Sequence, residues 1–161
     1  MNGCVTSEDE RHLLACIELA KQARDKGNHP FGAMLVDAQG EVVLEAENTV
    51  VTSRDCTAHA ESNLMRVASG RFDPEFLQIC TVYTSAEPCA MCSGAIYWGN
   101  VRRVVFALSE EVLRALAGTN PANPTLALPC REVFARGRHE VEVSGPHIEE
   151  QARAVHEDFW T

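Results

Sequence analysis

The sequence predicts a three-layer α/β/α sandwich built around a central, mixed sheet of about five strands. Three observations support this fold class. The chain has 161 residues, which is the usual size of one domain. Its apolar residues alternate between segments with helical spacing and short segments typical of strands. No internal repeat or linker interrupts this alternation, so we expect residues 1–161 to form a single domain.

The first element is predicted to be a helix. Ser7 stands three residues before Glu10, which is a capping-box pattern, and apolar residues then recur at helical spacing to about Arg24. The Gly-Asn-His-Pro segment at 27–30 is expected to end this helix, because a residue that precedes proline avoids the helical backbone conformation.

The remaining elements alternate between strands and helices. Strands are expected at 31–36, 42–47, 79–84, 101–107 and 141–143. Helices are expected at 58–68, from Pro88 to about Tyr97, after a cap at Ser109, and at the C-terminus as far as Phe159 and Trp160. Polar loops are expected at 48–57 and 118–124.

Charge and composition narrow the class of partner. The formal net charge is −9, with 14 Lys and Arg against 23 Asp and Glu. Proteins that bind nucleic acid usually carry a basic stripe, so this balance argues against a polyanionic ligand and favours a small uncharged one. No apolar run approaches the roughly 18 residues that cross a bilayer, and residues 1–11 do not resemble a signal peptide. We therefore expect a cytoplasmic protein without a membrane segment.

The histidine and cysteine residues predict a metal centre. Only two of the seven cysteines, Cys89 and Cys92, have the spacing of metal ligands, and on a helix they share one face. At a helix start the dipole favours the thiolate that zinc requires. With His59 they supply three ligands, which leaves a fourth position for water of lowered pKa. Glu61 projects differently from His59 and suits contact with that water, whereas Cys56 is expected only near the site. We expect one Zn²⁺ per chain.

This pattern has two alternative interpretations, a redox pair and a structural zinc site. A lone C-x-x-C also occurs in redox pairs and in structural zinc sites. A structural site needs four ligands, and the chain has no second C-x-x-C or H-x₃-H to close it. A non-catalytic zinc-binding module remains the competing class, but it has no need for Glu61. Among the other histidines, His29 could approach a pocket. Those in polar segments are expected to be solvated, namely His12, His139, His147 and His156.

These residues resemble the cytidine deaminase superfamily, whose signature is H-x-E followed by P-C-x-x-C. The chain is especially similar to the branch of bacterial guanine deaminases and nucleoside deaminases. The similarity covers roughly residues 20–107 and fades afterwards. Its strongest segments are HPFGA at 29–33, TAHAE at 57–61 and TSAEPCAMCSGAIYW at 84–98. The resemblance implies the cytidine deaminase-like version of the predicted sandwich.

The resemblance also implies roles for individual residues. His59, Cys89 and Cys92 would bind zinc, and Glu61 would carry a proton from the zinc-bound water to the ring nitrogen and then to the leaving amine. Substrate contacts would come from the side chain of Asn48, the backbone N–H of Ala60, and the ring of Phe31 or Trp98.

The chain differs from the guanine deaminase pattern in one segment that bears on the substrate. Guanine deaminases usually carry an acidic pair after the strand that ends near 107, whereas this chain has Gly-Thr-Asn-Pro-Ala-Asn-Pro at 118–124. We expect hydrolytic deamination of a free nucleobase or related small aminated heterocycle, guanine-like first, with a cytosine, cytidine or triazine ring as the alternative. Editing of tRNA adenosine is disfavoured by the acidic charge and by the absence of a basic tail.

The C-terminal tail, about 145–161, is a further expectation of the resemblance. In guanine deaminases this segment crosses to a partner subunit and closes the site. Residues 157–160 could do the same in a homodimer, or they could pack as a terminal helix on their own core.

Overall fold

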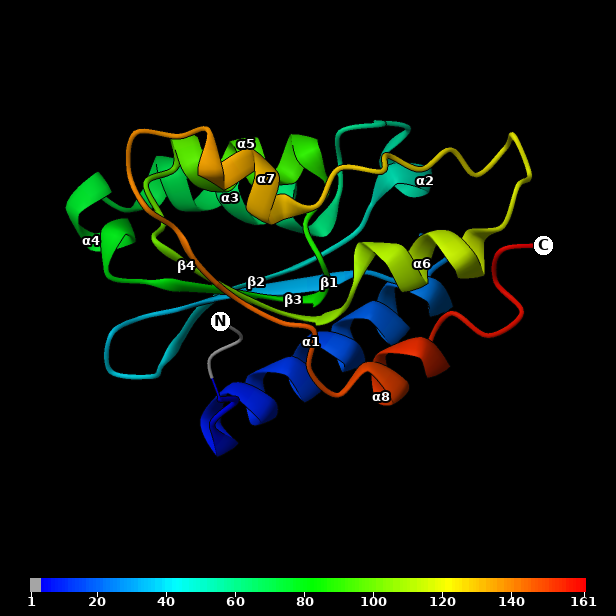
Figure 1. The fold of residues 1–161 in the computed structure, drawn as a ribbon, viewed down its shortest axis with the longest axis horizontal. Coiled ribbons are helices and arrows are strands. Elements are labelled where there is room, and N and C mark those ends of the chain that lie inside the picture. Colours follow the sequence, from blue (N-terminus) through cyan, green and yellow to red (C-terminus); the bar gives the residue numbers. More distant parts are fainter. Residues whose placement is uncertain (1–3) are drawn as a thin grey trace.

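The structure, a computed structural model, describes residues 4–161 and contains one mixed, five-stranded sheet (Figure 1). The strand order is β2-β1-β3-β4-β5. β1 runs antiparallel to both of its neighbours, while β3, β4 and β5 are mutually parallel. The bounds of the strands are β1 (Gly32–Val36), β2 (Val42–Glu47), β3 (Thr81–Ala86), β4 (Arg103–Leu108) and β5 (Glu142–Ser144). The predicted mixed sheet is confirmed.

Helices cover both faces of the sheet, which completes the three layers. One apolar cluster joins α1 (Ser7–Asp25), α6 (Glu110–Ala117) and α8 (Glu149–Ala154) to one face. A second cluster joins α3 (Ala60–Arg71), α5 (Ala90–Trp98) and α7 (Cys130–Ala135) to the other. Along β1 the side chains alternate between the clusters, as the pleat of a strand requires: Leu35 belongs to the second and Met34 to the first. Within residues 4–161 no helix is long and apolar enough to cross a bilayer.

The capping-box pattern predicted Ser7 as the N-cap of the first helix. In the structure the N-cap is Thr6. The Thr6 side chain accepts a hydrogen bond from the backbone N–H of Asp9 at 3.0 Å, and the Asp9 carboxylate accepts one from the Thr6 N–H at 3.2 Å. The box is reciprocal because an aspartate stands three residues after Thr6. Ser7 lies one residue further on, inside the helix.

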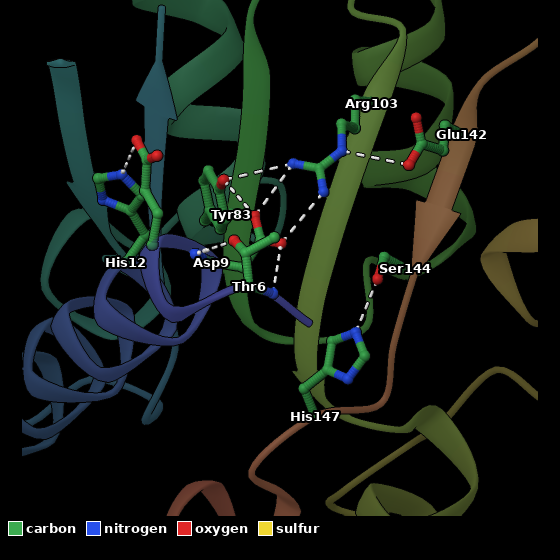
Figure 2. A network of polar contacts seen from close by, with 9 residues as sticks. Thr6, Asp9, His12, Tyr83, Arg103, Glu142, Ser144 and His147 are labelled. Carbon is green, nitrogen blue, oxygen red and sulfur yellow. Dashed lines mark hydrogen bonds and ion pairs between the residues drawn. The ribbon is translucent and has the colours of Figure 1, made fainter. Parts of the chain in front are cut away.

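Asp9 also links α1 to the sheet (Figure 2). The Tyr83 hydroxyl in β3 donates a hydrogen bond to Asp9 Oδ1 at 2.7 Å, and Arg103 Nη1 in β4 donates another at 3.1 Å. Arg103 Nε also donates to Glu142 in β5 at 3.3 Å. These charge-assisted contacts hold the pKa of the Asp9 carboxyl well below its usual range despite its burial. One carboxylate therefore connects the helix to two parallel strands.

Two of the four histidines that were expected in solvent are buried, and the other two are half-buried. His12 is buried against the ring of Tyr83, with 4.8 Å between the ring centroids. His156 is buried within the C-terminal tail, where its ring is parallel to that of Trp160 at 6.0 Å. His139 stacks on Tyr97 at 4.0 Å, and His147 Nε2 lies 2.7 Å from the Ser144 hydroxyl. The prediction was wrong because polarity of the surrounding sequence does not report which side of a helix or turn a residue occupies.

Several element bounds differ from the predictions. The 48–57 segment contains the short helix α2 (Val50–Ser53), and the structure adds α4 (Pro74–Gln78) and α7. α5 begins at Ala90, with Cys89 as its N-cap, so Pro88 precedes the helix instead of opening it. The last helix ends at Ala154 and not at 159–160. By contrast Ser109 caps α6 as predicted, accepting a hydrogen bond from Val112 N–H.

Gly32 allows α1 to pack directly on β1. A Cβ atom at this position would lie 2.5 Å from the Cys16 carbonyl oxygen and 2.5 Å from the Leu19 Cβ. The backbone N–H of Gly32 donates a hydrogen bond to the Ser85 hydroxyl at 3.1 Å, which joins the start of β1 to the end of β3. This close approach fixes α1 against the sheet at the edge where β1 begins.

Candidate metal centre

Polar side chains gather at one edge of the sheet. Because β1 is antiparallel to β2 and β3, the C-terminal ends of β2, β3 and β4 meet at the edge where β1 begins. Phe31 precedes β1, Asn48 follows β2, Glu87 and Cys89 follow β3, and Glu110 follows β4. Ligand sites of open α/β sheets usually lie outside the carboxyl ends of the strands. This edge is therefore where a functional site is expected.

Two helix N-termini bring the predicted metal ligands together. His59 is the N-cap of α3, Cys89 is the N-cap of α5, and Cys92 lies in the first turn of α5. His59 Nδ1 is 3.5 Å from the Sγ atom of Cys89 and 3.6 Å from that of Cys92. The Ser62 hydroxyl lies 3.3 Å from Cys92 Sγ. Both helix dipoles favour negative charge at this point, so the backbone supports the thiolate form.

The spacing of the three ligand atoms fits a tetrahedral zinc ion. With Zn–S bonds of about 2.3 Å and Zn–N bonds of about 2.0–2.1 Å, a tetrahedral ion holds N and S ligands about 3.6 Å apart. The observed N–S separations of 3.5 and 3.6 Å match this value. Among the described residues the cluster contains only His59, Cys89 and Cys92, with all ligand atoms within 4.8 Å of one another. A three-residue set with this chemistry leaves one coordination position open.

The electrostatics of the cluster favour a bound cation. Hydrogen bonds from Cys92 and His59 lower the pKa of the Cys89 thiol to about 4, against the effect of its burial. The resulting thiolate raises the pKa of His59 through their hydrogen bond. Burial, together with the charge on Cys89, raises the pKa of Glu61 to about 7. The site thus combines a thiol of lowered pKa, as zinc requires, with a buried carboxyl group of raised pKa.

A cavity of about 430 Å³ opens beside the cluster. Its walls are mostly apolar, and polar groups occur at a few points, which is typical of small-molecule sites. Five predicted site residues line it: Phe31, Asn48, His59, Glu61 and Cys89. His29 and Cys56 also line the cavity, as their positions in the sequence had suggested.

Asn48 is held in one orientation. It is buried, its side-chain Oδ1 accepts a hydrogen bond from the backbone N–H of Val50 at 3.0 Å, and its backbone N–H donates to the Phe31 carbonyl at 3.0 Å. Because the oxygen is engaged by the protein, the amide Nδ2 is the group that Asn48 offers to the cavity. The side chain therefore presents a hydrogen-bond donor.

Two residues predicted to contact a substrate do not line the cavity. Ala60 is fully buried as the first residue of α3, so only its backbone N–H, one of the free donors of the first helical turn, remains available for such a contact. Trp98 is 85% exposed at the last turn of α5, where its ring meets Tyr97 edge-on at 5.7 Å. The structure therefore does not bring Trp98 to the cavity of its own chain.

One wall of the cavity is formed by α6, which no motif in the sequence indicates. Glu110, Leu113, Arg114 and Ala117 line the cavity along one face of this helix. In the sequence Glu110 has only the pattern of an acidic residue in the first turn of a helix. The overlooked signal was its position, since α6 begins directly after β4, which is parallel to and paired with β3.

The C-terminal tail folds over the chain's own cavity. Trp160 lines the cavity and lies 5.6 Å from His29 and 6.1 Å from Phe31, measured between ring centroids. The Trp160 indole N–H donates a hydrogen bond to His156 Nδ1 at 3.0 Å, and Arg24 Nη1 donates to the Val155 carbonyl at 2.8 Å. In the single chain the tail thus packs on its own core. Exchange with a partner subunit stays a prediction.

Comparison with known proteins agrees with this geometry. The family described as "Cytidine and deoxycytidylate deaminase zinc-binding region" matches residues 6–108. The chain is 41% identical over 157 residues, 97% of its length and 94% of the relative's, to a protein named probable cytosine deaminase from Schizosaccharomyces pombe. It is 41% identical over 110 residues, 68% of its length and 69% of the relative's, to the guanine deaminase of Bacillus subtilis.

A solved structure shares the fold. That of the guanine deaminase from Nitrosomonas europaea aligns with a TM-score of 0.75 at 26% identity, and the alignment covers 95% of this chain and 84% of that one. The family match includes His59 and Glu61 together with the Cys89–Cys92 pair. The chain therefore belongs to the cytidine and deoxycytidylate deaminase family and is a zinc-binding, hydrolytic deaminase.

Proposed function

We propose that this deaminase removes the amino group of a free, guanine-like nucleobase or a related small aminated heterocycle. The observation that carries the proposal is the position of Glu61. Its carboxyl group is buried in the cavity wall, two residues from His59, and burial raises its pKa to about 7. A carboxyl group with such a pKa can accept a proton and return it at neutral pH.

The metal ligands and Glu61 divide the chemistry between them. His59, Cys89 and Cys92 would hold the zinc ion, which when bound supplies a water molecule of lowered pKa and a Lewis acid. Glu61 would take a proton from that water, deliver it to the ring nitrogen next to the amine-bearing carbon, and pass a proton to the departing amine. One carboxyl group thus serves first as base and then as acid.

The cavity walls would orient the ring. The Asn48 amide offers a donor to an acceptor on the edge of the base, and the Ala60 N–H offers a second donor to a carbonyl oxygen. Phe31 stands at the start of β1 and would pack against the face of the ring, with Trp160 beside it. The apolar lining favours a small uncharged ligand, and the net charge of −9 argues against a polyanion such as tRNA.

A cytosine-like ring is the second candidate. The relative that matches almost the whole chain is named probable cytosine deaminase, and the Asn48 donor also suits the carbonyl of a pyrimidine. Guanine is placed first because the cavity of about 430 Å³ leaves room for a ring system larger than a pyrimidine.

An ammonia-release panel tests the proposal. The zinc-loaded protein would be assayed with guanine, guanosine, cytosine, cytidine, adenine, adenosine and aminated triazines. We expect the highest kcat/KM with guanine and no gel shift of tRNA at modest salt. Turnover of cytosine but not of guanine would favour the second candidate. Release of ammonia from none of these compounds would overturn the proposed function.

We also propose that the protein acts as a homodimer. Apolar side chains of α3 and α5 are exposed, namely Val67, Met91 and Trp98. Exposed apolar side chains are typical of protein–protein contacts, and the partner that we propose for them is a second copy of the chain. Light scattering would test this: we expect the mass of a dimer, and a monomer at micromolar concentration would contradict it.

A further inference from the structure

Glu110 is the acidic residue of the cavity that keeps a side-chain oxygen without a hydrogen-bond donor, although it pairs with Arg114. It lines the cavity and its side chain is only 12% exposed. Within the described residues no group donates a hydrogen bond to its buried Oε1 atom, and its nearest cation is Arg114 Nε at 3.5 Å. A buried carboxylate oxygen without a donor is costly, and an unsatisfied one that faces a cavity is suited to accept a hydrogen bond from a ligand.

The other two acids of the cavity are already accounted for. Glu87 uses both oxygens on the protein: Oε2 accepts from the Glu110 N–H and Oε1 from the Cys130 N–H, each at 2.9 Å. Glu61 stands beside the metal ligands and is assigned above to proton transfer. Of these three acids, Glu110 is therefore the one with a side-chain oxygen available to accept a hydrogen bond from a ligand.

The sheet places Glu110 across the cavity from Asn48. The two residues follow β4 and β2, which are separated by β3 and β1. With a spacing of about 4.8 Å between neighbouring strands, these strand ends lie about 14 Å apart. Asn48 offers a donor from one side and Glu110 an acceptor from the other. A fused two-ring heterocycle spans more of this width than a single six-membered ring does.

We propose that Glu110 is a specificity-determining residue that accepts a hydrogen bond from an N–H of the substrate's second ring. This inference rests on the proposed function and names the substrate class, a purine-type free base with an unsubstituted five-membered ring. Arg114 would position the carboxylate through their ion pair. Glu110 is a substrate-binding group and takes no part in moving protons at the amine-bearing carbon.

The neighbouring residue supplies a matched control. Glu111 is exposed, lies in the same first turn of α6, and carries the same charge near the helix N-terminus. Glu110→Leu removes the acceptor at similar volume, Glu110→Gln keeps one acceptor oxygen, and Glu111→Leu removes an equivalent charge outside the cavity. Zinc content and thermal unfolding of each variant report whether the site and the fold are intact.

The test compares guanine with 7-methylguanine and 9-methylguanine, in each of which a methyl group replaces the single N–H of the five-membered ring. We expect the wild type to prefer guanine over each of them by about tenfold or more in kcat/KM, the loss expected for a hydrogen bond to a charged group. In Glu110→Leu this preference should fall to within about twofold, mainly through a higher KM for guanine. Glu110→Gln should be intermediate and Glu111→Leu unchanged.

The outcomes separate the two proposals. If the wild type deaminates guanine but Glu110→Leu keeps the full preference, the methyl group is rejected by shape and the role of Glu110 is overturned. Equal losses in Glu110→Leu and Glu111→Leu would overturn it too, because helix charge would then explain both. If the wild type releases ammonia from cytosine alone, the purine assignment fails while a base deaminase remains. If it releases ammonia from no base, the proposed function itself fails.

Discussion

Glu87 holds the start of α6 against the end of β3 by accepting a 2.9 Å hydrogen bond from the backbone N–H of Glu110. The same carboxylate accepts a second bond from the N–H of Cys130 at the start of α7. Glu87 N–H in turn donates to the Leu108 carbonyl at 2.7 Å. One buried side chain therefore fixes two helices beside the loop that carries Cys89.

Glu87→Gln tests whether these two hydrogen bonds stabilise the fold. Glutamine has one carboxamide oxygen, so either the N–H of Glu110 or that of Cys130 loses its acceptor in a buried place. We expect the free energy of unfolding to fall by about 1–3 kcal/mol, and kcat/KM to fall because the α6 wall shifts. Urea denaturation would measure the loss. A stability equal to that of the wild type would contradict the role of Glu87 in holding α6 and α7.

Zinc binding should depend on Cys89 and not on its near neighbour Cys56. Serine is a poor zinc ligand, so we expect Cys89→Ser to hold well below one zinc per chain and to lose the stabilisation that the metal gives to the fold. Cys56→Ser alters an exposed thiol of the cavity wall and should keep one zinc. Elemental analysis after dialysis would distinguish them. Equal zinc contents would argue against the predicted ligand set.

The Asp9 network should stabilise the fold without affecting the cavity. Tyr83→Phe removes a buried donor to a carboxylate, which costs about 1.5–3 kcal/mol. The control is Tyr97→Phe, whose hydroxyl only accepts a hydrogen bond from the Arg138 N–H near the surface, and it should cost about 1 kcal/mol or less. If the two variants unfold at the same urea concentration, the link between α1 and the sheet contributes little.

His156 should make the fold sensitive to mild acid. Burial lowers its pKa in the folded chain from 6.5 to about 4, and Arg24 adds to this effect. The folded state thus binds the proton more weakly than the unfolded state, so the stability is fully present above pH 6.5 and declines as the pH falls towards 4. At pH 5 the loss should be about 2 kcal/mol.

His156→Gln serves as the reference because it cannot titrate. Urea denaturation at pH 7.5 and pH 5 should show a larger loss for the wild type than for the variant. A loss of the same size in both proteins would show that other groups cause the acid sensitivity.

The chemistry of the site could be predicted from sequence because each ligand stands at a fixed offset within a short string. The spacing of Cys89 and Cys92 places them on one helix face, and His59 and Glu61 are two residues apart. All five predicted strands are present, and two of them, β1 and β4, are apolar runs because they are buried on both faces. These features depend on local order in the chain.

What the sequence could not provide depends on contacts between distant segments. Glu110 acquires its place in the cavity from the parallel pairing of β4 with β3, and Trp160 from the packing of the tail against His29 and Phe31. The burial of His156 likewise follows from that packing. A side chain near the end of a strand or in a tail carries no periodic signal of what it will face.

Glu61 gives the most direct test of the central claim. Glu61→Gln preserves the shape of the side chain but removes the group that accepts and returns protons. The variant should retain one zinc per chain, measured by elemental analysis. Its kcat for ammonia release from the best substrate of the wild type should fall by about 10²- to 10⁴-fold. A variant that keeps both its zinc and its full kcat would contradict the account, because proton transfer at this site would then not depend on the buried carboxyl group.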